Sequence, residues 1–283
     1  MRKLARWLGA AVGLAALATI ALASWVYLRS EAYLNSFERP PSFALAIPDD
    51  DVARARGDHL VRTRGCRGCH GDDLGGQLMW GYAVPPNLPK LAREISAAEF
   101  EAALRHGIDH TGRAMRDMPS YNFLRLRDQD VADIIAYLRS APVAQHDLPR
   151  ASLPWSIRWD LARSHDVAIA AILDKVPPMK RAGEDSELAR GEYLAMTTCN
   201  ECHGLTLNAD SPFGDETAPS LMAVITGYDE AAFTRLMRTG KALGDRELPM
   251  MSGVARGRFV HFTDDELRDL YAFLKDRVAG TSQ

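Results

Sequence analysis

All four cysteines of the chain fall in two copies of one short pattern, C-x-x-C-H. The copies read GCRGCHG and CNECHG, and their members are Cys66, Cys69 and His70, followed by Cys199, Cys202 and His203. On a helical turn, two sulfurs at this spacing match the two vinyl groups of haem, and the next histidine offers an axial nitrogen to the iron. The pattern therefore predicts two covalently attached c-type haems.

Three other uses of paired cysteines fit less well. Four-cysteine zinc sites usually place their pairs about 15–20 residues apart, whereas these pairs begin at residues 66 and 199, 133 positions apart. A thioredoxin-like redox pair needs a βαβ context, which the sequence does not suggest. Structural disulfides are compatible with an exported protein but do not explain a histidine after both pairs.

The similarity between the two halves extends well beyond the cysteines. The residues that recur at the same offset of 133 include Cys66, His70, Pro86, Leu88, Phe100, Arg105, Gly107 and Arg113. The triplet Ala-Arg-Gly at residues 55–57 recurs at 189–191, one position further on. The soluble part of the chain thus contains one domain twice.

Each copy has helical periodicity and little strand-like alternation. Apolar spacing predicts helices over 95–105 and 228–238, with Ser96 as an N-cap, and closing helices over 128–139 and 264–275. We expect an all-α fold with two tandem haem domains after an N-terminal transmembrane helix. The predicted units are 1–30 (anchor), 31–51 (spacer), 52–141 (domain 1), 142–185 (connector) and 186–279 (domain 2).

Prolines characterise the spacer and the connector, so both are predicted to be semi-extended. A helix over roughly 159–173 is expected inside the connector.

Methionine is the soft axial ligand typical of electron-carrying cytochromes. Met118 recurs as Met251 at the 133 offset, whereas Met115 and Met250 have no methionine partner. We therefore predict Met118 and Met251 as sixth ligands, with Met250 as the alternative in the second copy. Core packing is expected for the remaining methionines considered, which are Met79, Met115, Met196, Met222 and Met237.

Two further repeated pairs could serve the haems. Pro86 and Pro219 each lie 16 residues after their histidine, where a backbone carbonyl could accept the proton of the second ring nitrogen. Arg105 and Arg238 are either solvated charges or partners of haem propionates.

The N-terminus combines Arg2, Lys3 and Arg6 with an uncharged stretch over 7–28. As a helix these 22 residues span about 33 Å, which is enough to cross a bilayer. Ala21-Leu22-Ala23 resembles a signal cleavage site, so a cleaved signal remains the alternative. We expect a single-pass anchor in a bacterial inner membrane with the haem domains in the periplasm. The formal net charge of −3 indicates no nucleic-acid partner.

These motifs, from ARGDHL through GCRGCHG, PPNL and GRAMRDMPSY to DVADIIAYLRS and their second copies, resemble those of membrane-anchored dihaem c-type cytochromes built from two class I domains. The resemblance implies the cytochrome c fold, His/Met ligation and periplasmic electron transfer, with a dehydrogenase or a terminal oxidase as redox partner. It implies an electron carrier rather than an enzyme. The alternatives are a dihaem peroxidase with one open haem site and a haem-based sensor.

Overall fold

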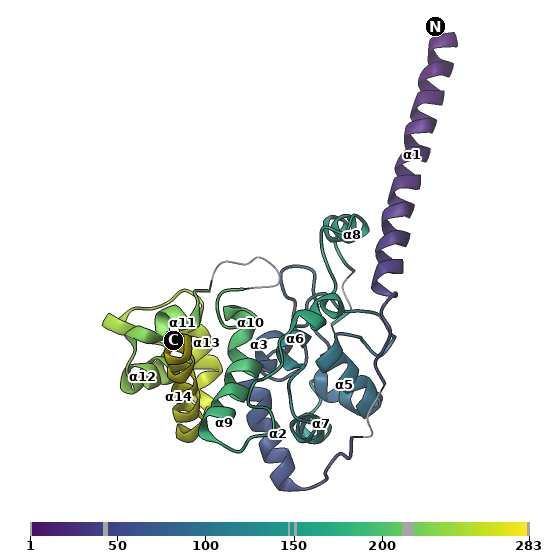
Figure 1. Ribbon diagram of the computed structural model, residues 1–283. Helices are drawn as coiled ribbons and strands as arrows, with labels where there is room; N and C mark the ends of the chain where they lie inside the picture. The colour runs from purple at the N-terminus through teal and green to yellow at the C-terminus, as the bar shows by residue number, and fades with distance from the viewer. Residues whose placement is uncertain (1, 42–44, 147, 150–151, 211–217, 282–283) are drawn as a thin grey trace.

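The computed structural model describes residues 2–41, 45–146, 148–149, 152–210 and 218–281. Within these ranges the chain forms helices and isolated β-bridges but no strand, which confirms the all-α class. Figure 1 shows two groups of helices beside each other, with α1 (Arg2–Leu34) projecting from the first group. We call the two groups domain 1 and domain 2.

The two domains present corresponding elements in the same order. Domain 1 contains α2 (Asp51–Thr63), α3 (Cys66–His70), α4 (Leu88–Glu94), α5 (Ala97–His106), α6 (Ser120–Phe123) and α7 (Asp128–Ser140). Domain 2 contains α9 (Glu187–Leu194), a π-helical turn (Ala195–Cys199), α10 (Asn200–His203), α11 (Leu221–Val224), α12 (Glu230–Thr239), α13 (Met251–Gly257) and α14 (Asp264–Thr281), with 3₁₀ turns at Ile225–Gly227, Leu243–Asp245 and Phe259–His261.

The predicted helix starts follow from side-chain capping. The Ser96 hydroxyl accepts the amide proton of Glu99, and the Glu99 carboxylate accepts that of Ser96, which completes a capping box at the start of α5. In domain 2, Asp229 caps α12 in the corresponding place. The four predicted helices are therefore confirmed as α5, α7, α12 and α14, with ends that differ by a few residues.

In each domain the first helix packs closely against the last. A Cβ added to Gly57 on α2 would overlap the carbonyl oxygen of Asp133 on α7, and a Cβ on Gly191 of α9 would overlap that of Asp269 on α14. Only glycine permits this backbone contact. The arginine before each glycine pairs with the same acid, at 2.7 Å for Arg56 to Asp133 and 2.6 Å for Arg190 to Asp269. The repeated Ala-Arg-Gly triplet thus encodes the helix crossing.

The connector is folded, so its prediction as a semi-extended spacer is wrong. Two helices occur where one was expected: α8 (Trp155–Ala162) and a 3₁₀ helix (Ile169–Lys175). A turn in which Ser164 has φ +59° separates them. Ile169 and Ile172 are buried against Tyr121 of domain 1 and Leu205 of domain 2. These apolar side chains outweigh the extending effect of the prolines.

The N-terminal helix runs four residues beyond the predicted anchor and is continuous with domain 1. Its outer turns are exposed, whereas Leu34 is completely buried and its carbonyl accepts the amide proton of Ala114 at 2.8 Å. Arg39, in the predicted spacer, donates to the carbonyls of Asp109 and His110. By length and composition α1 is a helix that could cross a membrane, a property shared by signal sequences.

The glycine crossing predicts a stability effect that depends on position. We expect Gly191→Ala to lower the free energy of unfolding by about 3 kcal/mol, because the new methyl group forces α9 and α14 apart. Gly253→Ala, on α13 of the same domain where a Cβ meets nothing within 4 Å, should change it by less than about 1 kcal/mol. Denaturant unfolding followed by circular dichroism measures both, and equal effects would contradict this account of the crossing.

Candidate functional site: two Cys-x-x-Cys-His centres at a domain interface

A cavity of about 660 Å³ lies in domain 1 next to the first C-x-x-C-H motif. Cys66, Cys69 and His70 form one wall, and Met118 lies among the lining residues contributed by the loop before α6. Most of the remaining wall is apolar and includes Leu88, Phe100, Leu104, Phe123, Ile134 and Leu138. This volume is within the range of roughly 300–1,000 Å³ that is usual for small-molecule and cofactor sites.

Both motif histidines are oriented by a proline carbonyl, as the matched spacing suggested. Nδ1 of His70 donates to the carbonyl of Pro86 at 2.9 Å, and Nδ1 of His203 donates to that of Pro219 at 2.7 Å. Since a carbonyl can only accept, the proton must be on Nδ1, and Nε2 keeps the lone pair that a metal requires. Burial lowers the pKa of His70 to about 4, so its imidazole is neutral at pH 7.

The second centre is built in the same way but is more open. Cys199 is buried in the core of domain 2, whereas Cys202 is exposed. The π-helical turn of residues 195–199 leads directly into this motif, where domain 1 has the left-handed Gly65 instead. Residues 211–217, in the loop between the histidine and Pro219, lie outside the described part of the chain.

The structure separates the two methionine candidates of domain 2 but not those of domain 1. In domain 1 both Met115 and Met118 line the cavity, although only Met118 was predicted to face it. In domain 2 Met251 is half-buried and packs against the core, while Met250 is 60% exposed. Met196 and Met237 are core residues as expected. This arrangement favours Met251 over Met250, and axial ligation by Met118 and Met251 stays a prediction.

The thiols do not resemble those of redox-active or zinc-binding pairs. Burial raises the pKa of Cys66 to about 11 and that of Cys199 to about 12, whereas catalytic cysteines have a lowered pKa. All four cysteines are free. Among the described residues, no three of the types His, Cys, Asp and Glu form a group that could hold a metal ion.

The repeated arginines Arg105 and Arg238 have a structural role. Arg105 is buried and pairs with Asp128 at 2.7 Å, and Arg238 pairs with Asp264 at 2.6 Å. Each also donates to a backbone carbonyl just before the same helix. They fix the start of the closing helix in each domain. This pairing contradicts the interpretation as solvated charges, and the propionate interpretation stays a prediction.

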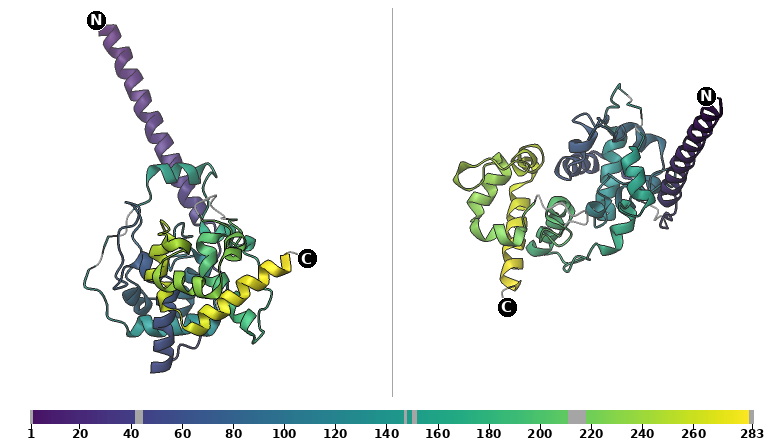
Figure 2. Two further views of the ribbon diagram at one scale, coloured as in Figure 1. Left: turned by 90° about the vertical axis from the view of Figure 1, so that its left-hand side faces the viewer. Right: turned by 90° about the horizontal axis from the view of Figure 1, so that it is seen from above.

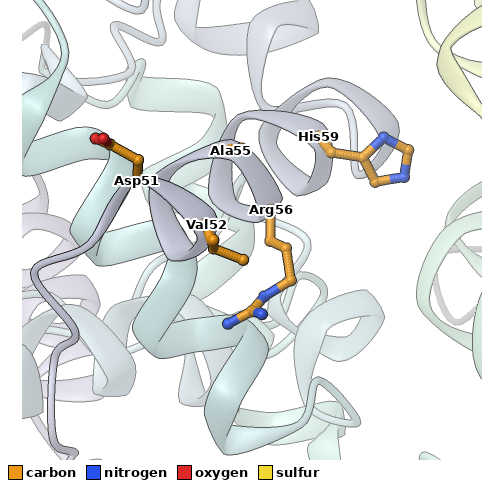
Figure 3. A pocket seen from close by; sticks show the side chains of 5 residues that line it. All are labelled: Asp51, Val52, Ala55, Arg56 and His59. Carbon is orange, nitrogen blue, oxygen red and sulfur yellow. The ribbon is translucent and has the colours of Figure 1, made fainter.

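A second hollow, of about 500 Å³, is a surface feature of α2 (Figure 3). Its polar side chains already have partners, since Arg56 pairs with Asp133 and His59 with Glu266 of domain 2 at 2.9 Å. Figure 3 shows Arg56 and His59 leaving the helix in different directions. This hollow therefore has no converging groups with which to bind a ligand.

The two motifs meet at the domain interface through Arg258, which sequence reasoning did not identify. The guanidinium of Arg258 donates to the carbonyls of Thr63 and Arg64, at the end of α2, at 2.8 Å each. It also pairs at 2.8 Å with Glu201, which stands between Cys199 and Cys202, and its side chain is only 11% exposed. One cation thus joins the segments that carry both motifs.

Gly65 makes this approach possible. It directly precedes Cys66, has φ +80°, and a Cβ there would lie 2.7 Å from Cζ of Arg258. A second interface contact is the hydroxyl of Tyr121, which donates to the carbonyl of Glu201 at 3.2 Å. Glu201 occupies a variable position of the motif and has no repeat signal. Arg258 corresponds to Arg125 at the 133 offset, but this spacing alone does not show that its side chain reaches the other domain.

Comparisons with known proteins agree with this geometry. The profile of the cytochrome c family matches residues 54–142 and 188–277, which together cover more than half of the chain. The chain belongs to the cytochrome c family. It is also 29% identical over 197 residues to the fructose dehydrogenase cytochrome subunit of Gluconobacter japonicus. That match covers 62% of this chain but only 38% of the subunit, so this cytochrome spans well under half of its relative.

Family membership implies covalently bound c-type haem, and two cytochrome c domains imply two haems. The residues of the first site fit such a group. The cavity offers two sulfurs, an imidazole whose Nε2 is available, and a thioether within an apolar lining. Bound haem supplies an iron that takes up and releases one electron, so this cytochrome acts in electron transfer.

The methionine assignment predicts a change in reduction potential. A methionine ligand raises the potential of a haem, so we expect Met118→Ala and Met251→Ala each to lower one potential by on the order of 100 mV. Met250→Ala is the matched control and should leave both potentials unchanged. Spectroelectrochemical titration measures them, and a large shift in the control alone would transfer the ligand role to Met250.

Proposed function

We propose that this cytochrome is a membrane-anchored dihaem electron carrier of the periplasm that takes electrons from a dehydrogenase and passes them to a terminal acceptor. It acts as an electron-transfer protein, or as such a subunit of an oxidoreductase, rather than as a catalyst of its own. The observation that carries this proposal is the contact between the two haem-attachment segments through Arg258. Two adjacent redox sites in one chain form a relay, whereas a hydrolytic or transferase site would need a general base or a nucleophile.

The proposed residue roles are supported by the contacts of the two motifs. The thioether-forming sulfurs are Cys66 and Cys69 in domain 1 and Cys199 and Cys202 in domain 2. His70 and His203 are the axial nitrogen ligands, held by Pro86 and Pro219. Met118 and Met251 complete the two iron sites, and with both axial positions filled neither iron has a position for a substrate.

A dehydrogenase as the electron donor is supported by the relative. The matched protein is named as the cytochrome subunit of a dehydrogenase. Because the match covers a minor part of that subunit, we propose only the class of donor, and not its substrate, for this chain. The acceptor is a protein or carrier of higher potential on the same side of the membrane.

Anchoring by α1 is supported by how the helix enters domain 1. Glu31, three residues beyond the uncharged stretch, pairs with Arg113 at 3.1 Å and with Arg158 at 2.7 Å. Arg113 in turn lines the haem cavity. A signal peptide normally ends in an extended, accessible cleavage region, whereas here the helix continues without interruption from Arg2 through Ala23 to Leu34.

Removing the charge of Arg258 tests the relay directly. A cation between two haems favours the reduced form of both, so we expect Arg258→Gln to lower both reduction potentials by on the order of 50 mV. Arg256→Gln removes the same charge two residues earlier, in the last turn of α13, but Arg256 is exposed and pairs with Glu247, so both potentials should change little.

Both variants should first show the haem content of the unmodified protein. A shift of only one potential in Arg258→Gln would mean that one haem lies far from this residue. A similar small shift in both variants would show that Arg258 does not lie between the two centres. Either result would contradict the relay.

A further inference from the structure

An exposed aromatic stripe on α8 is not explained by the cytochrome c domains. Trp155 is 58% exposed and Trp159 is 37% exposed. They are four residues apart, and Arg163 follows after four more, so all three share one side of the helix. The guanidinium of Arg163 lies 5.3 Å from the centre of the Trp159 ring. Large aromatic side chains left in water at such a site indicate a contact surface.

The position of α8 beside α1 shows what this surface contacts. The two helices pack against each other, as Figure 1 shows. Trp159 meets Trp25 of α1 edge to face, with ring centres 6.5 Å apart. Trp25 and Tyr27 lie at the outer end of the uncharged stretch, where about half of each side chain is exposed. Tryptophan and tyrosine concentrate at this level of a membrane, where the bilayer meets water.

Arg158, on a neighbouring face of α8, fixes the helix at this level. Its side chain is 10% exposed and donates to the hydroxyl of Ser30 at 3.0 Å and to Glu31 at 2.7 Å. It also lies over the ring of Tyr27 at 4.5 Å. Since Arg158 is held by α1, α8 cannot slide along the anchor. Trp155 and the part of Trp159 that Trp25 does not cover remain exposed beside α1.

We propose that α8 is an interfacial helix, with Trp155 and Trp159 inserted among the phospholipid head groups and Arg163 beside their phosphates. This inference rests on the membrane anchoring proposed above. Phospholipid is the occupant that the observations favour, because the stripe continues the aromatic end of an apolar helix and combines tryptophan with a cation. A protein partner would not explain why the stripe lies beside Trp25 and Tyr27, at the end of the apolar stretch of α1.

The contact would also determine how the haem domains face the membrane. Leu34 and Arg113 line the cavity of domain 1, and both are tied to the α1–α8 pair through Glu31 and the end of α1. Figures 1 and 2 show domain 2 on the far side of domain 1 from α1. With two attachment points, α1 and α8, the chain holds domain 1 next to the anchor, and domain 2 lies sideways from it (Figures 1 and 2).

Photo-crosslinking of the full-length, haem-loaded protein in phospholipid nanodiscs tests this inference. The photoreactive residue p-benzoylphenylalanine is placed at position 155, 159, 14 or 52, one at a time. Leu14 is an exposed residue within α1 and reports on anchoring itself. Val52 is 64% exposed at the start of α2, at the end of domain 1 remote from α1, and is the matched control (Figure 1). An unchanged haem spectrum verifies that each variant has folded.

We expect phospholipid adducts by mass spectrometry at positions 14, 155 and 159, and at least tenfold fewer at position 52. Adducts at position 14 but only control levels at 155 and 159 would overturn the interfacial role of α8 while leaving the anchor intact. Control levels at position 14 as well would overturn the anchoring on which the inference rests. Adducts from 155 or 159 to a separate protein molecule instead of lipid would also contradict the proposal, whereas an adduct from 159 to α1 of the same chain only reproduces the Trp25 contact.

Discussion

The close crossing of the first and last helix in each domain is the constraint on which both haem sites depend. The attachment motif follows the first helix directly, and the methionine loop precedes the last one. When Gly57 or Gly191 lets the two backbones touch, it therefore brings the segment with the histidine close to the segment with the methionine. In domain 1 both His70 and Met118 line the cavity. The buried acids that pair with Arg56 and Arg190 hold the same crossing in register. Rigid placement of both ligands is what electron transfer requires, because little then reorganises on a change of charge.

A second level of organisation joins the two sites to each other and to the N-terminal helix. Arg258 connects the segments that carry the two motifs, and Glu31 connects α1, α8 and the wall of the first cavity. In both cases a single charged side chain with few degrees of freedom bridges elements that are distant in sequence. Such buried charges are costly to leave unpaired, so each one enforces a particular arrangement of its neighbours. The result is an ordered series of anchor, first centre and second centre.

Features that depend on repetition could be predicted from the sequence. The offset of 133 located the proline carbonyls and the corresponding helices in each copy, because these residues do the same task twice. Features that arise from contact between the two copies could not be predicted from the sequence. Glu201 has no repeat partner. Arg258 corresponds to Arg125 at the 133 offset, but nothing in this spacing shows that its side chain meets Glu201 and the end of α2. The connector was judged by its prolines, whereas the burial of Ile169 and Ile172 decides its structure. Arg105 and Arg238 both pair with the first acid of the closing helix. Their repetition in the sequence does not by itself tell such a structural role from a role at the haem.

The most direct test of the account is carbon monoxide binding to the purified protein after reduction with dithionite, followed by visible absorption. The account predicts that neither haem binds carbon monoxide at neutral pH, because His70 with Met118 and His203 with Met251 fill all four axial positions. Ready binding at one haem of the unmodified protein would show an open iron. It would contradict the assignment of an electron carrier with two closed centres, and would favour a peroxidase-type or sensing function instead.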